Sequence, residues 1–293
     1  MKILVLGSEG FVGKNLVKGL SEQHEIYSAD LVDHSNHENY TKFDITNPDS
    51  VNKTVKNVDV VINLVAHSLV SSLESSSKNA QVNIIGLLNV LDACKNNNIE
   101  KIIFTSASSM IGEPTTERVS ETHLAKPKTA YGITKLASEH YLRLYKELYD
   151  LNFVIFRFFN IYGPFQKNGL IPTLYSRIMA EKPLTVFGKG DQIRDYVYIE
   201  DIIPFFEKAS SSNIADNSTF NMGTGLGTSI VEIIKLFENI LTIKPKIEYQ
   251  PLRPGEIGNF VANTELLSST FGMTPKTSVE YGLQKTIDWL KNN

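Results

Sequence analysis

The sequence predicts an α/β fold, in which a doubly wound parallel sheet is joined to a smaller C-terminal lobe. Three observations support this prediction. Short apolar runs alternate with helical patterns through the first half of the chain, which is typical of βαβ units. The first run, Ile3–Leu6, ends in a glycine-rich turn. After Tyr162-Gly163-Pro164 the alternation loosens, and glycine, proline and single charges are interspersed.

Local patterns justify each element in turn. Apolar or β-branched runs are predicted strands: Ile3–Leu6, Ile26–Ala29, Asp59–Val65, Lys101–Ser106 and Phe153–Arg157. Stretches with apolar residues at helical spacing are predicted helices: Val12–Leu20, Asn79–Lys95 and 129–149. We expect the helices to cover both faces of the sheet through right-handed crossovers.

The composition is that of a globular protein, with 42% hydrophobic and 21% charged residues. A net charge of −3 gives no electrostatic reason to expect a nucleic acid or an anionic membrane as partner. The apolar start is too short for a signal peptide, and no run approaches a membrane span. Cys94 is the single cysteine, and His34 and His37 lie in a polar loop without a third ligand. We therefore expect a cytoplasmic protein with no disulfide and no metal site.

The turn Gly7-Ser8-Glu9-Gly10-Phe11-Val12-Gly13 has the glycine spacing of a dinucleotide site between a strand and a helix. The helix N-terminus offers free N–H groups and a positive dipole end to a pyrophosphate. Asp30 closes the next strand, where a carboxylate binds the adenosine ribose and repels a 2′-phosphate, so NAD is favoured over NADP. The alternative is a sharp turn with no ligand.

Asp44-Ile45 follows the next turn region and has two interpretations. The pair either brackets the adenine, or Asp44 is an N-cap ahead of Asn47-Pro48-Asp49. His67 follows a buried strand, and it either borders the nicotinamide or is an interior histidine with its hydrogen bonds satisfied.

Tyr131 and Lys135 are four residues apart and share one helix face. An unperturbed tyrosine has a pKa near ~10, and a neighbouring ammonium together with a cationic nicotinamide ring favours the phenolate. The phenolate then removes a hydroxyl proton while hydride leaves for NAD. The alternative is a pair of ordinary helix-surface residues.

The ordered motifs of the chain resemble those of the extended short-chain dehydrogenases/reductases, the nucleotide-sugar epimerases and dehydratases, and among them the UDP-glucose 4-epimerases. The resemblance covers essentially the whole chain. Its markers are the glycine turn, Asp30, Asn83 before Gly86, Thr105-Ser106 through Gly112-Glu113-Pro114, Tyr131-Gly132-Ile133-Thr134-Lys135, Arg157 through Pro164, Arg194-Asp195-Tyr196-Val197 and Arg253-Pro254-Gly255-Glu256.

The resemblance implies a Rossmann-type NAD-binding domain over 1–165 and about 188–219, and a substrate-binding lobe over about 166–187 and 220–293. The implied cofactor-binding residues are Gly7, Gly10, Phe11, Val12, Gly13, Asp30, Leu31, Asp44, Ile45, Leu64, Val65, Ala66, Asn83, Thr105, Ser106, Tyr131, Lys135 and Phe158. The implied partners are a nucleotide sugar, with a UDP-hexose favoured, and a second copy of the chain, joined through helices near 79–95 and 129–149.

Two arginines suit the diphosphate of a nucleotide sugar, because a guanidinium binds phosphate oxygens in a bidentate manner. These are Arg194 and Arg253, and their alternatives are ion pairs, with Asp195 or Asp201 for Arg194 and with Glu256 for Arg253. The resemblance adds the other substrate-binding residues: Asn160, Leu170, Thr185, Phe187 and Glu256.

One departure from the family pattern concerns the catalytic hydroxyl. Family members place a Ser or Thr five residues before the glycine that matches Gly112, and Ala107 stands there. Ser108 or Ser106 supplies the hydroxyl instead, or the enzyme works without it; we favour Ser108 as the third catalytic residue beside Tyr131 and Lys135. The alternative is that these serines only satisfy backbone groups at a strand end.

Family members that catalyse different reactions carry different residues in this same loop. Its dehydratases use an Asp-Glu pair where this chain has Ser108-Ser109, and its decarboxylases use a glutamate at Ser109. Of these family reactions, oxidation of the sugar followed by its re-reduction remains. We therefore predict NAD-dependent epimerisation, in which UDP-glucose and UDP-galactose are interconverted at C4 through a transient 4-keto sugar. The alternatives are a nucleotide-sugar reductase or dehydratase of the same family, and a protein that binds NAD or a nucleotide sugar without turnover.

Overall fold

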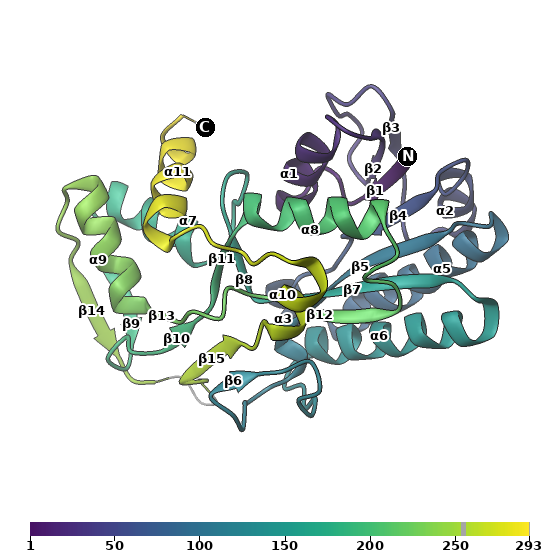
Figure 1. Ribbon diagram of the computed structural model, residues 1–293. Coiled ribbons are helices and arrows are strands. Elements are labelled where there is room, and N and C mark those ends of the chain that lie inside the picture. Colours follow the sequence, from purple (N-terminus) through teal and green to yellow (C-terminus); the bar gives the residue numbers. More distant parts are fainter. Residues whose placement is uncertain (253–255, 293) are drawn as a thin grey trace.

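Seven parallel strands form the central sheet of the computed structural model, which describes residues 1–252 and 256–292 (Figure 1). Across the sheet the order is β12 (Ser218–Met222), β7 (Asn152–Phe158), β5 (Lys101–Ala107), β4 (Val60–Asn63), β1 (Lys2–Leu6), β2 (Glu25–Asp30) and β3 (Tyr40–Lys42). The order reverses direction at β1 and β4, so a crevice opens there at the carboxyl ends of the strands.

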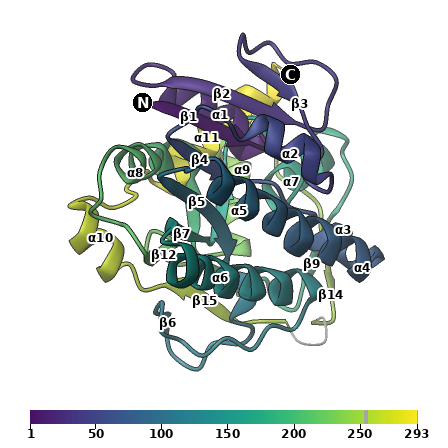
Figure 2. The same cartoon turned by 90° about the vertical axis from the view of Figure 1, so that its right-hand side faces the viewer.

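Both faces of this sheet are buried, because successive strand residues point to opposite sides. Ile3 and Val5 pack into one hydrophobic cluster, whereas Leu4 and Leu6 pack into the other. The first cluster lies under α1 (Phe11–Leu20), α8 (Ile199–Ser211) and α10 (Glu265–Phe271), and the second under α2 (Pro48–Thr54), α5 (Gly86–Asn96) and α6 (Ala130–Tyr149). Figure 2 shows α5 and α6 side by side on their face of the sheet. The predicted doubly wound, Rossmann-type sheet is confirmed.

The elements differ from the sequence prediction at β3 and around the expected helix over Asn79–Lys95. Strand β3 was not predicted, because three residues are too few to show an alternating pattern. The expected helix over Asn79–Lys95 is three consecutive pieces: α4 (Ser76–Ala80), a π-helical turn over Gln81–Ile85, and α5. The preceding helix, α3 (Leu69–Glu74), was not predicted either.

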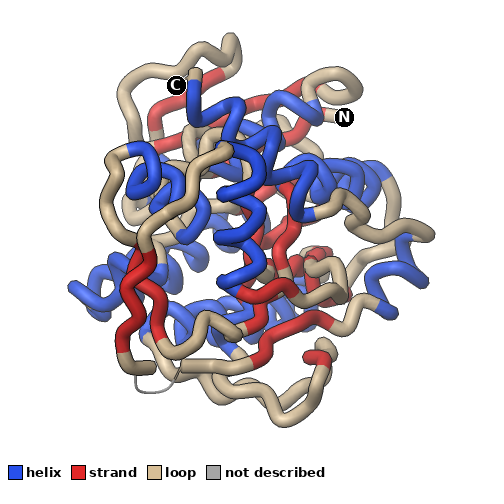
Figure 3. Tube along the Cα trace, turned by 90° about the vertical axis from the view of Figure 1, so that its left-hand side faces the viewer, coloured by secondary structure: helices blue, strands red, loops and turns tan. Residues whose placement is uncertain are grey.

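Short strands and three helices build the smaller lobe, which lies on the left of Figure 1. One sheet has the order β13 (Thr228–Ser229), β10 (Ile193–Arg194), β15 (Asn259–Ala262) and β6 (Arg118–Val119). Two parallel pairs are β14 (Ile247–Gln250) with β9 (Leu184–Phe187), and β11 (Tyr196–Tyr198) with β8 (Asn160–Tyr162). The helices are α7 (Leu170–Met179), α9 (Ile230–Leu241) and the C-terminal α11 (Val279–Lys291), which Figure 3 shows from this side.

The chain passes between the two lobes more than once. Residue 220, where we expected the smaller lobe to resume, lies inside β12 of the central sheet. Strand β10 lies in the segment expected to return to the larger domain, yet it pairs with β15 of the smaller sheet. The lobes are therefore interwoven, and the cleft between them is framed by both.

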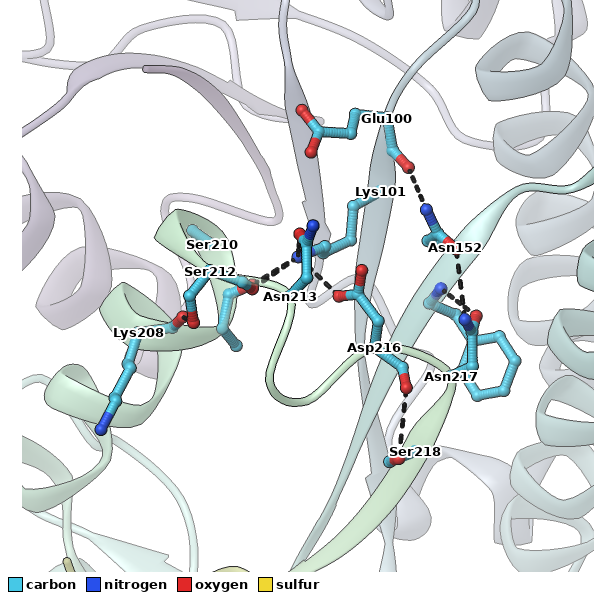
Figure 4. Close-up of polar contacts among 12 residues, drawn as sticks. Glu100, Lys101, Asn152, Lys208, Ser210, Ser212, Asn213, Asp216, Asn217 and Ser218 are labelled. Atoms are coloured by element: carbon cyan, nitrogen blue, oxygen red, sulfur yellow. Dashed lines mark hydrogen bonds and ion pairs between the residues drawn. The ribbon is translucent and has the colours of Figure 1, made fainter. Parts of the chain in front are cut away.

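A buried lysine fixes the connection from α8 to β12. Lys101, at the start of β5, is 1% exposed, and its Nζ lies 2.6 Å from Asp216 Oδ1. The same ammonium donates to the carbonyl oxygens of Ala209 at 3.1 Å and Ser212 at 2.8 Å (Figure 4). The ammonium thus satisfies carbonyls at the end of α8 as a helix C-cap. This anchor is at the amino ends of the strands, away from the crevice.

No helix in the described parts of the chain is long and apolar enough to cross a membrane.

Candidate active site

The carboxyl ends of four neighbouring strands, β7, β5, β4 and β1, meet at one cavity of about 380 Å³, and residues at or after these ends line it. Polar side chains and backbone from β4, β5, β7 and α6 meet apolar residues from the first turn of α1. The sequence-predicted residues that line it are Phe11, Val12, Leu64, Ala66, Thr105, Ser106, Ser108, Tyr131, Lys135, Phe158 and Asn160. Residues far apart in the chain therefore converge where the family resemblance implied a reaction centre.

The glycine turn has the shape that a pyrophosphate needs. Gly7 has φ +84°, and a Cβ on Gly13 would lie 2.2 Å from the Gly7 carbonyl oxygen, so both positions require glycine. A Cβ on Gly10 would meet only that same oxygen, at 3.3 Å, because the space in front of it is open. This space leads into a second cavity of about 580 Å³, lined by Gly10, Phe11 and Lys14 among others. The turn and the N-terminus of α1 therefore fit a dinucleotide.

On the adenosine side, Asp30 ends β2 beside the glycine turn. Its Oδ2 accepts from the backbone N–H of Glu9 at 2.9 Å, and its Oδ1 accepts from the N–H of Leu31. Leu31 itself is exposed at the mouth of the site. Asp30 thus keeps further acceptor capacity for ribose hydroxyls.

Three predicted cofactor residues differ in their exposure: Asp44 is exposed, Ile45 is buried and Val65 is half-buried. Asp44 is not an N-cap: Asn47 caps α2, and Asp44 Oδ1 instead accepts from the backbone and hydroxyl of Thr46. The Ile45 side chain is buried against Gly86. Val65 is half-buried and packs against the hydrophobic cluster under α2, α5 and α6, to which Ile45 also belongs.

Asn83 is held by protein partners on both ends of its amide. Its Oδ1 accepts from the N–H of His67 at 2.7 Å, and its Nδ2 donates to the His67 carbonyl and to Thr134 Oγ1. Asn79 also donates to the His67 carbonyl, at 2.8 Å. The π-helical turn places Asn83 toward α6, so its side chain positions the loop after β4.

Helix α6 begins where it does because Thr129 is its N-cap, and its hydroxyl accepts from the N–H of Gly132. A Cβ on Gly132 would lie 2.8 Å from the Ser109 carbonyl oxygen. Glycine therefore lets the first turn of α6 pack directly against the Ser108–Met110 turn that follows β5. This contact brings Tyr131 and Ser108 to the same cavity.

Lys135 lies one turn beyond Tyr131, buried beneath it. Its Nζ donates to the Thr105 carbonyl at 2.7 Å and lies 4.5 Å from the centre of the Phe104 ring. The distance from Nζ to the centre of the Tyr131 ring is 5.6 Å. The lysine is thus fixed in place by β5 and α6 together.

The pKa values of Tyr131 and Lys135 correct the expectation that the neighbouring ammonium helps to make Tyr131 a phenolate. Burial raises the pKa of Tyr131 to about 12. Burial also lowers the pKa of Lys135 to about 7, although the Glu139 carboxylate acts in the opposite direction. Because the lysine loses part of its own charge, the protein groups alone do not make Tyr131 a phenolate. An oxidised nicotinamide, when bound, supplies positive charge that stabilises the phenolate.

The two candidate hydroxyls have different surroundings. Ser106 Oγ lies 3.8 Å from Met110 Sδ and stabilises the charged form of Glu139, so this hydroxyl is engaged by protein groups. Ser108 lines the cavity, and its hydroxyl has no hydrogen-bond partner among the described residues. This difference favours Ser108, as the sequence suggested, while Ala107 adds only a methyl group to the wall.

A buried ion pair supports the helix that carries the tyrosine. Glu139, fully buried on α6, accepts from Arg157 Nε at 2.9 Å and Nη2 at 2.8 Å. The other Arg157 nitrogen, Nη1, donates to the Glu121 carbonyl at 2.7 Å. Although burial raises the pKa of Glu139, the Arg157 hydrogen bonds outweigh it, so the carboxyl pKa lies below its ordinary value. In the sequence, Arg157 stood out only as a motif residue, and Glu139, which lies four residues after Lys135, did not stand out at all.

The cavity continues into the smaller lobe as a cleft. A region of about 390 Å³ shares Asn160 with the first cavity and contains Leu170, Arg194 and Glu256. It leads to a further region of about 540 Å³ that includes Thr185 and Phe187. The predicted substrate residues that the structure describes therefore form one continuous surface from the tyrosine outward.

Charged and polar groups line this cleft at its middle. Arg194 Nη2 donates to Glu256 Oε1 at 2.9 Å, so its partner is neither Asp195 nor Asp201. Asn160 Nδ2 donates to the Asp195 carbonyl at 3.1 Å. Leu170 begins α7, whose unpaired backbone N–H groups suit a diphosphate. Arg253 lies outside the described residues.

Two glutamines were missed by the sequence analysis. Gln192 is 6% exposed, its Nε2 donates to the Phe187 carbonyl at 2.7 Å, and its Oε1 is buried without a partner beside the cleft. Gln166 lines the wall shared by the cofactor and substrate cavities. Gln192 lies two residues before Arg194 in an extended segment, so period-two spacing was the available signal.

The histidines form no metal centre in the parts of the chain that the structure describes. Across residues 1–252 and 256–292, no three His, Cys, Asp or Glu side chains come together as metal ligands would. The His67 backbone is held by Asn79 and Asn83, and His37 lies 3.8 Å from Glu9 Oε1.

Comparison with known proteins agrees with this geometry. The profile of the NAD dependent epimerase/dehydratase family matches residues 3–223. The chain is 29% identical over 306 residues to a putative UDP-glucose 4-epimerase of Methanocaldococcus jannaschii, with 99% of both chains covered.

Two solved structures are also similar. The UDP-glucuronic acid 4-epimerase from Bacillus cereus, in complex with UDP-glucuronic acid and NAD, has a TM-score of 0.92 at 29% identity and covers 100% of this chain and 99% of its own. The UDP-N-acetylglucosamine 4-epimerase from Methanobrevibacter ruminantium, in complex with UDP-N-acetylmuramic acid, has a TM-score of 0.92 at 28% identity and covers 99% of this chain and 98% of its own. The protein therefore belongs to the NAD dependent epimerase/dehydratase family of extended short-chain dehydrogenases/reductases, a family of NAD-dependent nucleotide-sugar epimerases.

Proposed function

We propose that this protein interconverts UDP-glucose and UDP-galactose by NAD-dependent epimerisation at C4, through a transient 4-keto sugar. The observation that supports this proposal is the convergence of Tyr131, Lys135 and Ser108 on a cavity that continues into the substrate cleft. Tyr131 takes the proton of the sugar hydroxyl, and Lys135 and Ser108 orient the tyrosine and the hydroxyl. The family cofactor NAD supplies hydride acceptance and return.

The lining of the cavity favours redox chemistry over water loss. A dehydratase needs side chains that hold and release protons on both sides of the departing hydroxyl. The described residues around Tyr131 include no aspartate or glutamate, and Ser108 and Ser109 occupy the loop positions concerned. Oxidation and re-reduction need only one acid–base group, which Tyr131 supplies.

The charge of the cavity favours a neutral hexose. A uronic acid substrate brings a carboxylate, which is stabilised by a free cation or by several donors. The one cation among the described lining residues is Lys135, and its Nζ already donates to the Thr105 carbonyl. The amide groups of Asn160 and Gln166 suit sugar hydroxyls instead.

The outer cleft supports binding of a uridine diphosphate. Arg194 and the N-terminus of α7 provide positive potential for two phosphates. Thr185, Phe187 and Gln192 surround the outer end, where a pyrimidine base would pack. The unpartnered Oε1 of Gln192 is an acceptor for a base N–H.

Product analysis tests the proposal directly. The protein is incubated, without added NAD, with UDP-glucose, UDP-galactose, their N-acetyl counterparts and UDP-glucuronate. We expect interconversion of the first pair to be fastest, and Tyr131→Phe to lower kcat by at least about 100-fold while NAD binding is retained. In a second incubation with added NADH, net consumption of the reduced cofactor would indicate a reductase, and tight binding without turnover in either incubation would indicate a sensor.

We also propose a homodimer that forms through α5 and α6. Ile133, Leu144 and Leu148 lie on one face of α6, and with Ile85 they are between 41% and 58% exposed. Exposed apolar side chains in such a stripe are typical of an interface between helices. Light scattering coupled to size exclusion should give the mass of two chains, and Leu148→Glu should shift it toward one.

A further inference from the structure

We propose that Glu9 makes the cofactor site selective for NAD over NADP, as a second carboxylate beside Asp30. The inference rests on the proposed contact between Asp30 and the adenosine ribose. It concerns the cofactor alone and requires no assumption about the sugar.

Glu9 lies inside the glycine turn, next to the end of β2. Its backbone N–H donates to Asp30 Oδ2 at 2.9 Å, so the two residues are fixed side by side although 21 positions separate them. A phosphate attached to a ribose hydroxyl at Asp30 would therefore approach residue 9 as well.

The Glu9 side chain extends toward loop 31–39, which follows Asp30. Its Oε1 accepts from the Ser35 hydroxyl and lies 3.8 Å from His37 Nε2. Its Oε2 lies 3.2 Å from Lys14 Nζ on the first turn of α1. One carboxylate thus ties together the glycine turn, α1 and the loop beside the ribose position.

Glu9 is charged at neutral pH. Burial raises its pKa, but the hydrogen bond from Ser35 and the contact with Lys14 outweigh burial, so the pKa lies below its ordinary value. The charge is held in place beside loop 31–39, because the side chain is only 16% exposed and has partners on both oxygens.

Without Glu9, the same neighbours would suit a phosphate. Lys14 is a cation, His37 is a titratable donor and Ser35 is a hydroxyl, which are the groups that bind phosphate oxygens. Glu9 occupies these donors and adds a negative charge. NADP would therefore meet two carboxylates, whereas the uncharged 2′-hydroxyl of NAD meets no such repulsion.

Titration calorimetry with NAD and NADP, on protein freed of bound nucleotide, tests the inference. Glu9→Gln keeps the shape and an acceptor for Ser35 but removes the charge. We expect the Kd of NADP to fall about tenfold, which corresponds to about 1.4 kcal/mol, while the Kd of NAD changes less than about threefold. Glu9→Ala is the second variant, and circular dichroism checks that both fold.

Three control variants separate the explanations. Glu38→Gln removes the same net charge from an exposed position of the same loop and should leave the ratio of the two Kd values unchanged. Ser35→Ala loosens the loop but keeps the Glu9 charge, so it should weaken both cofactors alike. Asp30→Asn should itself relax the selectivity.

The outcomes are unambiguous. If Asp30→Asn changes the ratio and Glu9→Gln does not, the role of Glu9 is refuted while the cofactor site stands. If neither variant changes it, the proposed ribose contact is wrong. If Glu38→Gln shifts the ratio as much as Glu9→Gln, general charge explains the effect and the inference is overturned.

Discussion

Lys135→Met should stabilise the folded protein while it abolishes turnover. Lys135 is 2% exposed, and among the described residues its ammonium has one hydrogen bond, to the Thr105 carbonyl, and no ion pair. A methionine of similar length fills the same space without a charge. The variant therefore separates what the lysine does for catalysis from what it does to stability.

The magnitude follows from the ionisation of the buried amine. Burial lowers the pKa of Lys135 from 10.5 to about 7, so the unfolded chain binds more protons than the folded one between these values. The free energy of unfolding therefore rises with pH between these two pKa values, because the cost of burying the charged lysine falls. Below the lower value this cost is fully present. At about pH 7 the charge costs about 4 kcal/mol, and at about pH 9 about 2 kcal/mol.

Removal of the amine also leaves the Thr105 carbonyl without its donor, which costs about 1–3 kcal/mol. We therefore expect Lys135→Met to raise the free energy of unfolding by about 1–3 kcal/mol near pH 7, and to lose most of this gain near pH 9. Urea unfolding of nucleotide-free protein at both pH values measures the difference.

The chain contains a matched control. Lys101 is as deeply buried, but its ammonium pairs with Asp216 and caps two carbonyls (Figure 4). Lys101→Met should therefore destabilise the protein, by about 2–4 kcal/mol, because one partner of a buried pair is removed. If both variants change stability in the same direction, the electrostatic reasoning is refuted.

Five further variants test the site. Ser108→Ala should lower kcat about 10- to 100-fold and Ser106→Ala much less, measured by steady-state kinetics, because the Ser106 hydroxyl is engaged by Met110 and Glu139, whereas the Ser108 hydroxyl lines the cavity. Ala107→Ser should leave kcat unchanged or raise it, and a large loss would mean that the loop differs from the family arrangement. Gly132→Ala should cost about 1–3 kcal/mol of stability and lower kcat, because its Cβ would lie 2.8 Å from the Ser109 carbonyl oxygen. Gln192→Leu should raise KM for the UDP-sugar about tenfold with little change in kcat, and a kcat effect without a KM effect would contradict its role at the base.

The central fold was predictable because its signals are local. Apolar runs such as Ile3–Leu6 are continuous because both faces of the sheet are buried, and the glycine turn follows directly from the spacing of Gly7 and Gly13. The interwoven boundary was not predictable, since the pairing of β10 with β15 joins segments more than 60 residues apart. Such pairing leaves no local pattern in the sequence.

The site was predictable only in part, for the same reason. Tyr131 and Lys135 share a helix, so their proximity follows from spacing alone. The pKa of Tyr131 depends on burial, which spacing does not reveal, and burial raises this pKa rather than lowering it. The pairing of Glu139 with Arg157 and the location of Gln192 also depend on contacts between separate elements.

Epimerisation by this protein requires that the sugar hydrogen leaves as hydride and returns from the cofactor. Turnover in deuterium oxide, followed by mass and NMR analysis of the product, tests this claim directly. We predict that the inverted carbon keeps its original hydrogen, because the proton handled by Tyr131 belongs to the hydroxyl. Deuterium from solvent on the inverted carbon would contradict the mechanism.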